Sequence, residues 1–269
     1  MTWTRRVTKA ETRLNWHETA TDPPPVADPV SMFRQAVGEP DPWQAQLLQS
    51  EAGRVLLCCS RQAGKSQTTA ILALWQALAV PDSLVLLCSP SLRQSAELFR
   101  KVWQAYVTLG RPVPAVASTL TRLELSNGSR LISLPGTEST VRSFSAAALV
   151  VVDEASRVSE ELIFAVRPFV AVSQGRLIVL STPAGRSGWF AREWHDGEGW
   201  ERTRVTAWEI PRIPRDFLEA EERSLPSVVF KAEYLAEFLD DVNSVFSVAD
   251  IQRAISADVQ ILRFDEEEE

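Results

Sequence analysis

Four short segments with apolar centres recur along the chain, and stretches with helical patterns lie between them. The segments are RVLLCCS (54–60), SLVLLCS (83–89), AALVVVDEAS (147–156) and GRLIVLSTPAG (175–185). A strand that is apolar on both sides has to be covered on both faces, and strands that alternate with helices form parallel sheets. The sequence therefore predicts an α/β fold in which a mainly parallel sheet is flanked by helices.

Capping and turn residues predict the connections between these strands. Asp41 followed by Pro42 marks a helix start, with an end near Gly53, and Ser91 is the expected N-cap of a helix that runs to Leu109. Helical patterns also cover 64–80 and 159–171. In TLTRLELSNGSRLISLPG (119–136), Asn127-Gly128 separates two alternating runs, which predicts a β-hairpin inserted into the α/β pattern.

Changes in composition predict four parts of the chain. Residues 1–30 are polar and contain three consecutive prolines, which favours a flexible arm. The α/β core spans 31–205. Residues 206–246 are first interrupted by prolines and then helical, which indicates a small helical lid. Residues 247–269 are interpreted as a linker and an acidic tail.

The stretch CSRQAGKS (59–66) lies between the first strand and the helix that follows it. Backbone N–H groups and the dipole at such a helix start bind phosphate groups. Gly64 would let the backbone approach them, Lys65 would reach the β and γ oxygens, and the Ser66 hydroxyl would bind Mg²⁺. Cys59 stands where the usual phosphate-loop pattern has a glycine.

Two acids follow the third apolar strand. Asp153 ends the strand, where it can hold a magnesium ion, and Glu154 follows as a carboxylate able to polarise a water molecule. A strand that ends in two solvated acids is the alternative interpretation. The phosphate loop on the first strand favours nucleotide hydrolysis.

Two further motifs fit the same site. Gln44 lies upstream of the first strand, and its amide can both donate to and accept from an adenine edge, although a polar position on an amphipathic helix explains it equally well. Ser181-Thr182-Pro183 ends the fourth strand, where a hydroxyl could sense the γ-phosphate. A simple strand-ending turn is the alternative for this motif.

Composition excludes several other classes of protein. No apolar run approaches the roughly 20 residues that span a bilayer, so no membrane role is expected. Cys58, Cys59 and Cys88 lie in the apolar strands and are interpreted as reduced core residues. With two histidines in the chain, a zinc site or a serine triad has little support. The net charge is −7, of which the last five residues supply five charges.

The motifs PWQ, SRQAGKS, LVVVDEAS, LIVLSTPAGRSGWF and VFKAEYLAEFLDDVNSVF occur in this order between Asp41 and Phe246. Together they resemble the ATPase domain of the large terminase subunit, the DNA-packaging motor of tailed bacteriophages. In that family the first loop position is commonly not glycine, and the fold is that of an ASCE-type P-loop NTPase.

The resemblance implies a role for each matching residue. Residues Ser60, Arg61, Gln62, Ala63, Gly64, Lys65, Ser66 and Gln67 would bind ATP, with Ser66 and Asp153 at Mg²⁺ and Glu154 as the catalytic carboxylate. Arg61 would lie near the γ-phosphate and Gln44 would read adenine. Ser181, Thr182 and Pro183 would couple hydrolysis to movement.

The resemblance also implies partners and a location. They are double-stranded DNA, a portal protein, a small terminase subunit and a homo-oligomeric ring on a procapsid, in the cytoplasm of a host cell, with a monomer in solution as an alternative. A large terminase also has a C-terminal nuclease domain. This chain stops about where that domain should begin, so we expect no nuclease activity from it. Arg142, with Arg122 second, is the sequence candidate for an arginine that acts on a neighbouring subunit.

Two other functions share part of this pattern. A superfamily 2 helicase has similar motifs but needs a second RecA-like domain, and only 86 residues follow Pro183. A ring-assembly module that binds ATP without turnover is the other alternative. The intact Lys65, Asp153 and Glu154 argue against such a module, and phosphate release separates the two.

Overall fold

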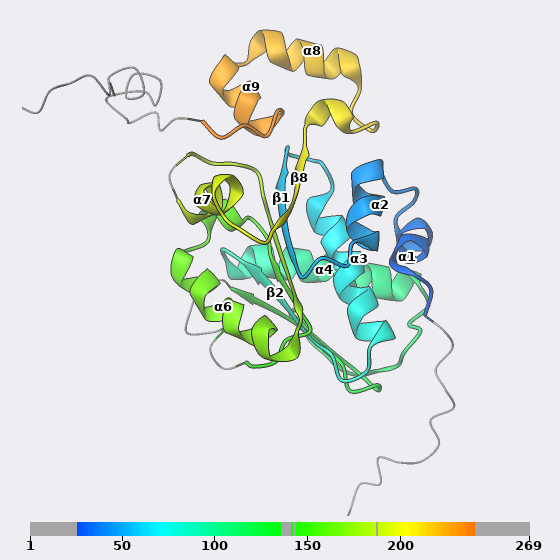
Figure 1. The fold of residues 1–269 in the computed structure, drawn as a ribbon. Helices are drawn as coiled ribbons and strands as arrows, with labels where there is room; N and C mark the ends of the chain where they lie inside the picture. The colour runs from blue at the N-terminus through cyan, green and yellow to red at the C-terminus, as the bar shows by residue number, and fades with distance from the viewer. Residues whose placement is uncertain (1–25, 136–140, 142–143, 187, 240–269) are drawn as a thin grey trace, which may run out of the picture.

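The computed structural model describes residues 26–135, 141, 144–186 and 188–239 (Figure 1). Within them lies an eight-stranded sheet with strand order β3-β4-β5-β2-β6-β7-β1-β8. Its strands are β1 (Arg54–Cys59), β2 (Leu84–Ser89), β3 (Ala115–Ser118), β4 (Arg122–Leu125), β5 (Arg130–Pro135), β6 (Leu149–Val152), β7 (Arg176–Ser181) and β8 (Glu201–Val205). The α-helices are α1 (Pro29–Ala36), α2 (Pro42–Gln49), α3 (Lys65–Ala79), α4 (Leu92–Thr108), α6 (Glu160–Ser173), α7 (Trp189–His195), α8 (Arg215–Ser224) and α9 (Ser227–Glu233), and η1 (Ala155–Arg157) and η2 (Ala207–Glu209) are 3-10 turns.

Most neighbouring strands run parallel. Strand β1 pairs in parallel with β7 and β8, β2 with β5 and β6, and β6 with β7. The pairs β3–β4 and β4–β5 are antiparallel. This confirms the α/β fold with a mainly parallel sheet. It also brings the carboxyl ends of β1, β6 and β7 together at one end of the sheet.

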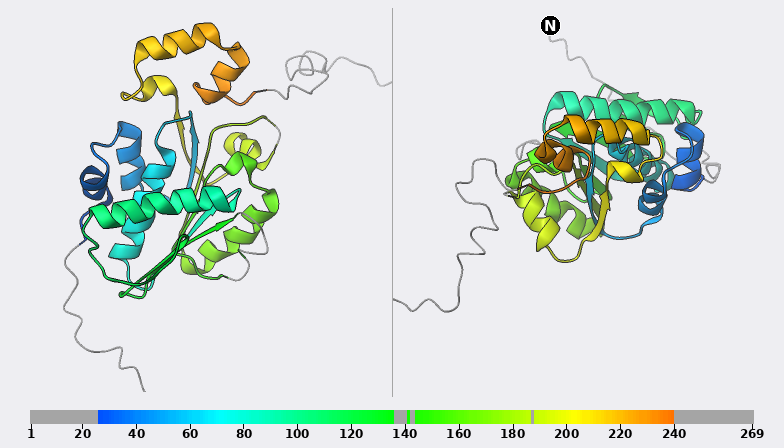
Figure 2. Two further views of the ribbon diagram at one scale, coloured as in Figure 1. Left: turned by 180° about the vertical axis from the view of Figure 1, so that it is seen from behind. Right: turned by 90° about the horizontal axis from the view of Figure 1, so that it is seen from above.

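Helices cover both faces of the sheet (Figures 1 and 2). Along β1, Val55, Leu57 and Cys59 belong to the apolar cluster that includes α1 to α4. Leu56 and Cys58 belong to the cluster that includes α6 and α7. Alternate side chains of a strand point to opposite faces, so an all-apolar strand contributes side chains to the apolar clusters on both faces of the sheet. No helix in the described ranges is both long and apolar enough to cross a membrane.

Helices α8 and α9 lie beyond the end of the sheet at which β1 finishes (Figure 1). They follow β8 through η2 and belong to the range that the sequence assigned to the lid. The backbone N–H of Arg61, in the loop after β1, donates to the Glu233 carbonyl at the end of α9, at 2.9 Å. The two helices therefore contact the loop that follows β1.

The N-terminal helices differ from the sequence prediction. Helix α1 begins at Pro29, within the range assigned to the arm, because Asp28 caps it by accepting from the N–H groups of Val30 and Ser31, both at 3.0 Å. Helix α2 starts at Pro42 as expected but ends at Gln49, before Gly53.

The predicted hairpin forms, but it is part of the main sheet. Strands β4 and β5 flank Asn127-Gly128, and Gly128 has φ of +83°, which suits glycine. The hairpin is inserted between α4 and β6, as expected, and because β5 also pairs in parallel with β2, its strands join the main sheet. Strands β3 and β8 and helix α7 were not predicted. Strand β3 is exposed along its whole length, and strand β8, at the opposite edge of the sheet, is polar up to Val205.

The three cysteines are buried and free, as the sequence indicated. Burial raises the pKa of the Cys59 and Cys88 thiols to about 12 and that of Cys58 as well. These thiols are therefore almost entirely protonated at pH 8, whereas the thiolate is the reactive form. We expect an aromatic disulfide reagent to leave all three thiols unmodified in the folded protein at pH 8 and to modify three after denaturation. Rapid modification of the folded chain would contradict this packing.

Candidate functional site

The loop after β1 turns sharply into helix α3. Cys59 is the last residue of β1 and is fully buried, so this position belongs to an extended strand and needs no glycine. Two later residues have left-handed backbones, Gln62 with φ of +60° and Gly64 with φ of +91°. The loop thus makes its turn after Cys59, which explains why a cysteine is tolerated there.

Gly64 is required by its backbone angle and by its surroundings. A Cβ atom at this position would lie 2.7 Å from Nε2 of Gln44, closer than side chains approach one another. Lys65 is the first residue of α3, so Gly64 is its N-cap. The N–H groups at the start of α3 are those that bind phosphate in such loops.

Lys65 is held at the mouth of the loop. Its Nζ donates to the carbonyl of Ser60 at 2.9 Å, to that of Cys59 at 3.3 Å and to Oγ1 of Thr182 at 3.1 Å. The residue is only 7% exposed. A buried ammonium group fixed in this way presents its charge at one defined place.

Ser66 and Asp153 meet across the site. The Ser66 hydroxyl donates to Oδ2 of Asp153 at 2.7 Å, which brings the first turn of α3 to the end of β6. These are two oxygen ligands of the kind that Mg²⁺ prefers, and Mg²⁺ commonly takes its remaining ligands from water and phosphate. In the described ranges no cluster of three His, Cys, Asp or Glu residues suggests a metal cage. The two oxygen donors of Ser66 and Asp153 fit magnesium by their chemistry.

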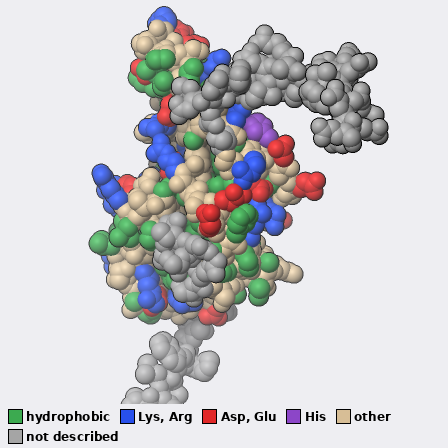
Figure 3. All heavy atoms as spheres, turned by 90° about the vertical axis from the view of Figure 1, so that its left-hand side faces the viewer, with side chains coloured by type: hydrophobic (Ala, Val, Ile, Leu, Met, Phe, Trp, Pro, Cys, Tyr) green, Lys and Arg blue, Asp and Glu red, His purple; other side chains and the backbone are tan. Residues whose placement is uncertain are grey.

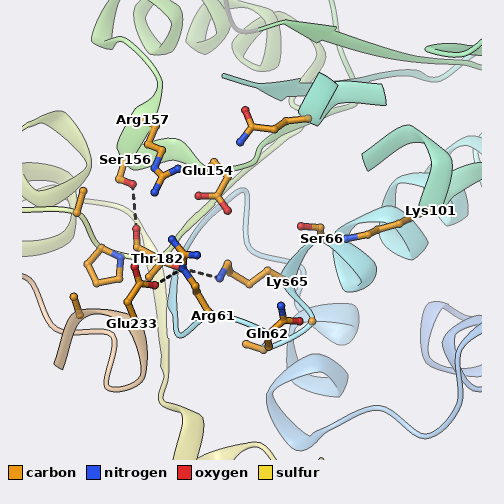
Figure 4. Close-up of a pocket in the computed structure, with 16 residues that line it drawn as sticks. Arg61, Gln62, Lys65, Ser66, Lys101, Glu154, Ser156, Arg157, Thr182 and Glu233 are labelled. Atoms are coloured by element: carbon orange, nitrogen blue, oxygen red, sulfur yellow. Dashed lines mark hydrogen bonds and ion pairs between the residues drawn. The ribbon is translucent and has the colours of Figure 1, made fainter. Parts of the chain in front are cut away.

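Glu154 projects from a strained turn. Its backbone is left-handed, with φ of +52° and ψ of +42°, and its N–H donates to Oδ1 of Asp153 at 2.9 Å. A non-glycine residue in this region costs free energy and is often found at functional sites. The turn directs the half-buried Glu154 side chain toward Lys65 and away from the core (Figure 4).

These side chains line one cleft of about 460 Å³ (Figure 4). The predicted residues on its wall are Arg61, Gln62, Ala63, Gly64, Lys65, Ser66, Glu154, Thr182 and Pro183. Residues on the wall that the sequence interpretation missed are Gln94, Lys101, Ser156, Arg157, Ala184, Ala232 and Glu233. Ser156 and Arg157 lie two and three residues after Glu154, and this closeness to the two acids was a signal, whereas Lys101 and Glu233 come from α4 and α9 by tertiary contact.

The three predicted coupling residues take different positions. Thr182 contacts Lys65 through its hydroxyl, and Pro183 lines the cleft beside it. Ser181 is fully buried behind them, and its hydroxyl lies 2.7 Å from that of Ser156. The end of β7 thus connects the loop lysine with the turn that follows Glu154.

Some predicted residues lie elsewhere than expected. Gln44 is 2% exposed; its Oε1 accepts from the Asp41 N–H at 2.8 Å and its Nε2 donates to Oγ1 of Thr68 at 3.0 Å, so its amide caps α2 and braces α3. Ser60 is fully buried, and Gln67 lies on α3 outside the cleft wall. An adenine contact by Gln44 stays a prediction.

The predicted arginines also differ in their surroundings. Arg61 lines the cleft, but its guanidinium forms an ion pair with Glu233 of α9 (Figure 4). Arg122 lies on β4, where it pairs with Glu124. Arg142 lies outside the described residues.

The order of the strands defines the class of protein. Strand β7 lies between the loop strand β1 and the acid strand β6, and the loop lysine and serine face the Asp-Glu pair. This arrangement is that of the ASCE class of P-loop NTPases, as the sequence predicted.

Residues 56–253 match the family model described as terminase large subunit, T4likevirus-type, N-terminal, and the chain belongs to this family. It is 27% identical over 260 residues to a terminase large subunit of Thermus virus P23-45, a match that covers 83% of this chain and 54% of that protein. The chain thus spans about half the length of the curated relatives it matches.

Solved structures share the fold. The Thermus phage P74-26 large terminase ATPase domain superposes with a TM-score of 0.68 at 21% identity, covering 80% of this chain and all of that one. The large terminase of a thermophilic bacteriophage, in complex with ATP-gamma-S, superposes with a TM-score of 0.60 at 14% identity, covering 74% of this chain and 53% of that one.

Proposed function

We propose that this chain hydrolyses ATP and that hydrolysis drives double-stranded DNA into a procapsid, as the motor of a phage terminase. The observation that carries the proposal is the 2.7 Å contact between Ser66 and Asp153, with Lys65 and Glu154 on the same cleft. Membership of the terminase large subunit family supports the link to DNA packaging.

In this proposal the loop binds the triphosphate of ATP. The N–H groups at the start of α3 hold phosphate oxygens, and Lys65 moves part of its hydrogen bonding from the loop carbonyls to the β and γ oxygens. Ser66 and Asp153 would hold Mg²⁺, which supplies positive charge beside the phosphates. The complexes of the thermophilic bacteriophage large terminase with ADP and with ATP-gamma-S support nucleotide binding by this fold.

Glu154 is the proposed catalytic carboxylate. It orients a water molecule toward the γ-phosphorus and accepts its proton as the bond to the β–γ bridging oxygen breaks. The products are ADP and phosphate. The left-handed turn at Glu154 favours this role because it fixes where the carboxylate projects.

Loss of the γ-phosphate would be transmitted through Thr182 and through the lid. Thr182 contacts Lys65, and Arg61 joins the loop to α9 through both its backbone and its side chain. A change in the phosphate-bound state of the loop would therefore shift the bonds that hold α9. This supports Ser181-Thr182-Pro183 and the α8–α9 pair as coupling elements.

The proposed setting is a homo-oligomeric ring on a portal protein, with a small terminase subunit, in the cytoplasm of an infected host cell. The face built by α6 and α7 carries acidic and basic side chains side by side (Figure 3), including the ion pairs Arg192–Glu160 and Arg167–Glu193. DNA contact needs an excess of Lys and Arg, so this mixed face is a poor DNA surface.

Phosphate release tests the proposal. The purified chain with Mg²⁺ and ATP should release phosphate, and double-stranded DNA should raise the rate. Absence of turnover above a background with no protein, with and without DNA, would reject the ATPase function. Packaging itself requires the portal-loaded procapsid, and DNA protected from nuclease digestion is the readout.

Lys65→Ala should weaken ATP-gamma-S binding about tenfold to a hundredfold, because it removes a charged hydrogen-bond donor worth roughly 1.5–3 kcal/mol. Titration calorimetry measures the change. Lys231→Ala is the matched control, since Lys231 is an exposed lysine on α9 away from the cleft wall. Equal affinity of the parent and Lys65→Ala, with both folded by thermal melting, would remove Lys65 from the phosphate site.

A further inference from the structure

Arg157 lies on the cleft wall three residues after Glu154. It is the last residue of η1, between Ala155 and Val158, which are buried in the apolar cluster on the α6 side of the sheet. Because these neighbours anchor the turn, the exposed Arg157 side chain projects away from the core and lines the cleft. Figure 4 shows Arg157 and Glu154 on the same wall.

The turn that carries Arg157 is fixed on two sides. The Ser156 N–H donates to Oγ of Ser181 at 3.1 Å, and the Ser156 hydroxyl donates to the Thr182 carbonyl at 3.0 Å. On the other side, Nε1 of Trp189 donates to the Val158 carbonyl at 2.8 Å. A charge held on such a fixed support loses little free energy to reorganisation when a reaction develops opposite charge near it.

The cations of the cleft differ in what they bind. Lys65 has three oxygen partners, and Arg61 is paired with Glu233. Within the described part of the chain, neither the Arg157 guanidinium nor the Lys101 ammonium group has a hydrogen-bond partner or an ion pair. Of these two, Arg157 is on the turn that carries Glu154, so its donors are available to an anion beside that carboxylate.

We propose that Arg157 is a catalytic residue that acts within its own subunit, by donating hydrogen bonds to the γ-phosphoryl oxygens of ATP. The proposal rests on the ATPase function proposed above. As water attacks and the bond to the bridging oxygen breaks, charge builds on the equatorial oxygens, and the guanidinium stabilises it. Arg157 transfers no proton; the water proton goes to Glu154.

Arg157→Ala should lower kcat about a hundredfold, the effect of removing one positioned donor to a transition state. The Kd for ADP should change less than about threefold, since ADP lacks the γ-phosphate. Tight binding of ADP with aluminium fluoride, which mimics the transferred group, should be lost. Arg157→Lys should recover part of kcat, and it keeps the test valid if the alanine variant fails to fold.

Arg93→Ala is the matched control, because Arg93 is an exposed arginine on α4 outside the cleft wall. An active parent with an equally active Arg157→Ala variant would overturn this proposal alone, whereas an inactive parent would overturn the ATPase function. Equal losses in ADP and aluminium fluoride binding would assign Arg157 to ground-state binding and also overturn it.

Mixing tests the assignment to one subunit. Glu154→Gln and Arg157→Ala remove two groups from the same cleft, so no exchange of subunits restores an intact site. The mixture should show only the sum of the two separate activities. Activity above that sum would mean that Arg157 serves a neighbouring subunit.

Discussion

Glu154→Gln should lower the rate of ATP hydrolysis by about two orders of magnitude or more, while binding of Mg-ATP stays nearly unchanged. The change keeps the size of the side chain but removes the carboxylate that we propose accepts a proton, and loss of a positioned base commonly costs this much. The contact between Asp153 and Ser66, the proposed metal ligands, does not involve the Glu154 side chain and should persist in the variant. The loss should therefore fall on kcat, not on nucleotide affinity.

Single-turnover phosphate release and calorimetric titration with ATP-gamma-S measure the two effects separately. Glu161→Gln is the matched control, since Glu161 is an exposed acid on α6 outside the cleft wall. Hydrolysis at the parental rate by the Glu154 variant would show that another group activates the water. A parallel loss of affinity would instead place Glu154 among the binding residues.

The strands predicted from the sequence share one physical property. Strands β1, β2, β6 and β7 are buried on both faces, and that burial requires the continuous apolar runs by which they were recognised. Strands β3 and β8 lie at the two edges of the sheet, where one side meets solvent. Their polar or mixed composition gave no strand signal.

The site follows the same division. Four site residues were predicted because each lies next to a recognisable strand and the carboxyl ends of parallel strands meet at one end of the sheet. They are Lys65, Ser66, Asp153 and Glu154. The structure brings these four residues together at that end of the sheet, and their chemical roles stay predictions.

Contacts between distant segments were not predictable. The pairing of Arg61 with Glu233 depends on where α9 lies over the loop, and no local pattern encodes that position. For Gln44 the sequence left open an adenine-reading amide and a polar position on an amphipathic helix, and the structure shows hydrogen bonds of its amide to Asp41 and Thr68. The sequence identified the amide but not its partners.

Arg142→Ala should lower ATP hydrolysis by about 10³- to 10⁵-fold in assembled rings, if Arg142 acts as an arginine finger on the neighbouring subunit. Arg142 lies outside the described residues and eleven positions before Asp153. The nearest described residues are Val141, which is buried in the apolar cluster on the α6 side of the sheet, and Phe144, which packs against that cluster. A surface arginine with a weak ion pair is the competing interpretation, and it predicts little change in rate.

Mixing separates a contribution from the neighbouring subunit from one within the same subunit. In a head-to-tail ring made from equal amounts of Arg142→Ala and Glu154→Gln subunits, about one quarter of the interfaces join an intact Glu154 to an intact Arg142. Activity should then rise well above the sum of the two inactive proteins, toward about a quarter of the parental rate if sites act independently. The mixture of Arg157→Ala with Glu154→Gln is the internal control, because that pair shares one cleft and should show no such recovery. Verified mixed rings that stay inactive in both mixtures would remove Arg142 from the neighbour's site.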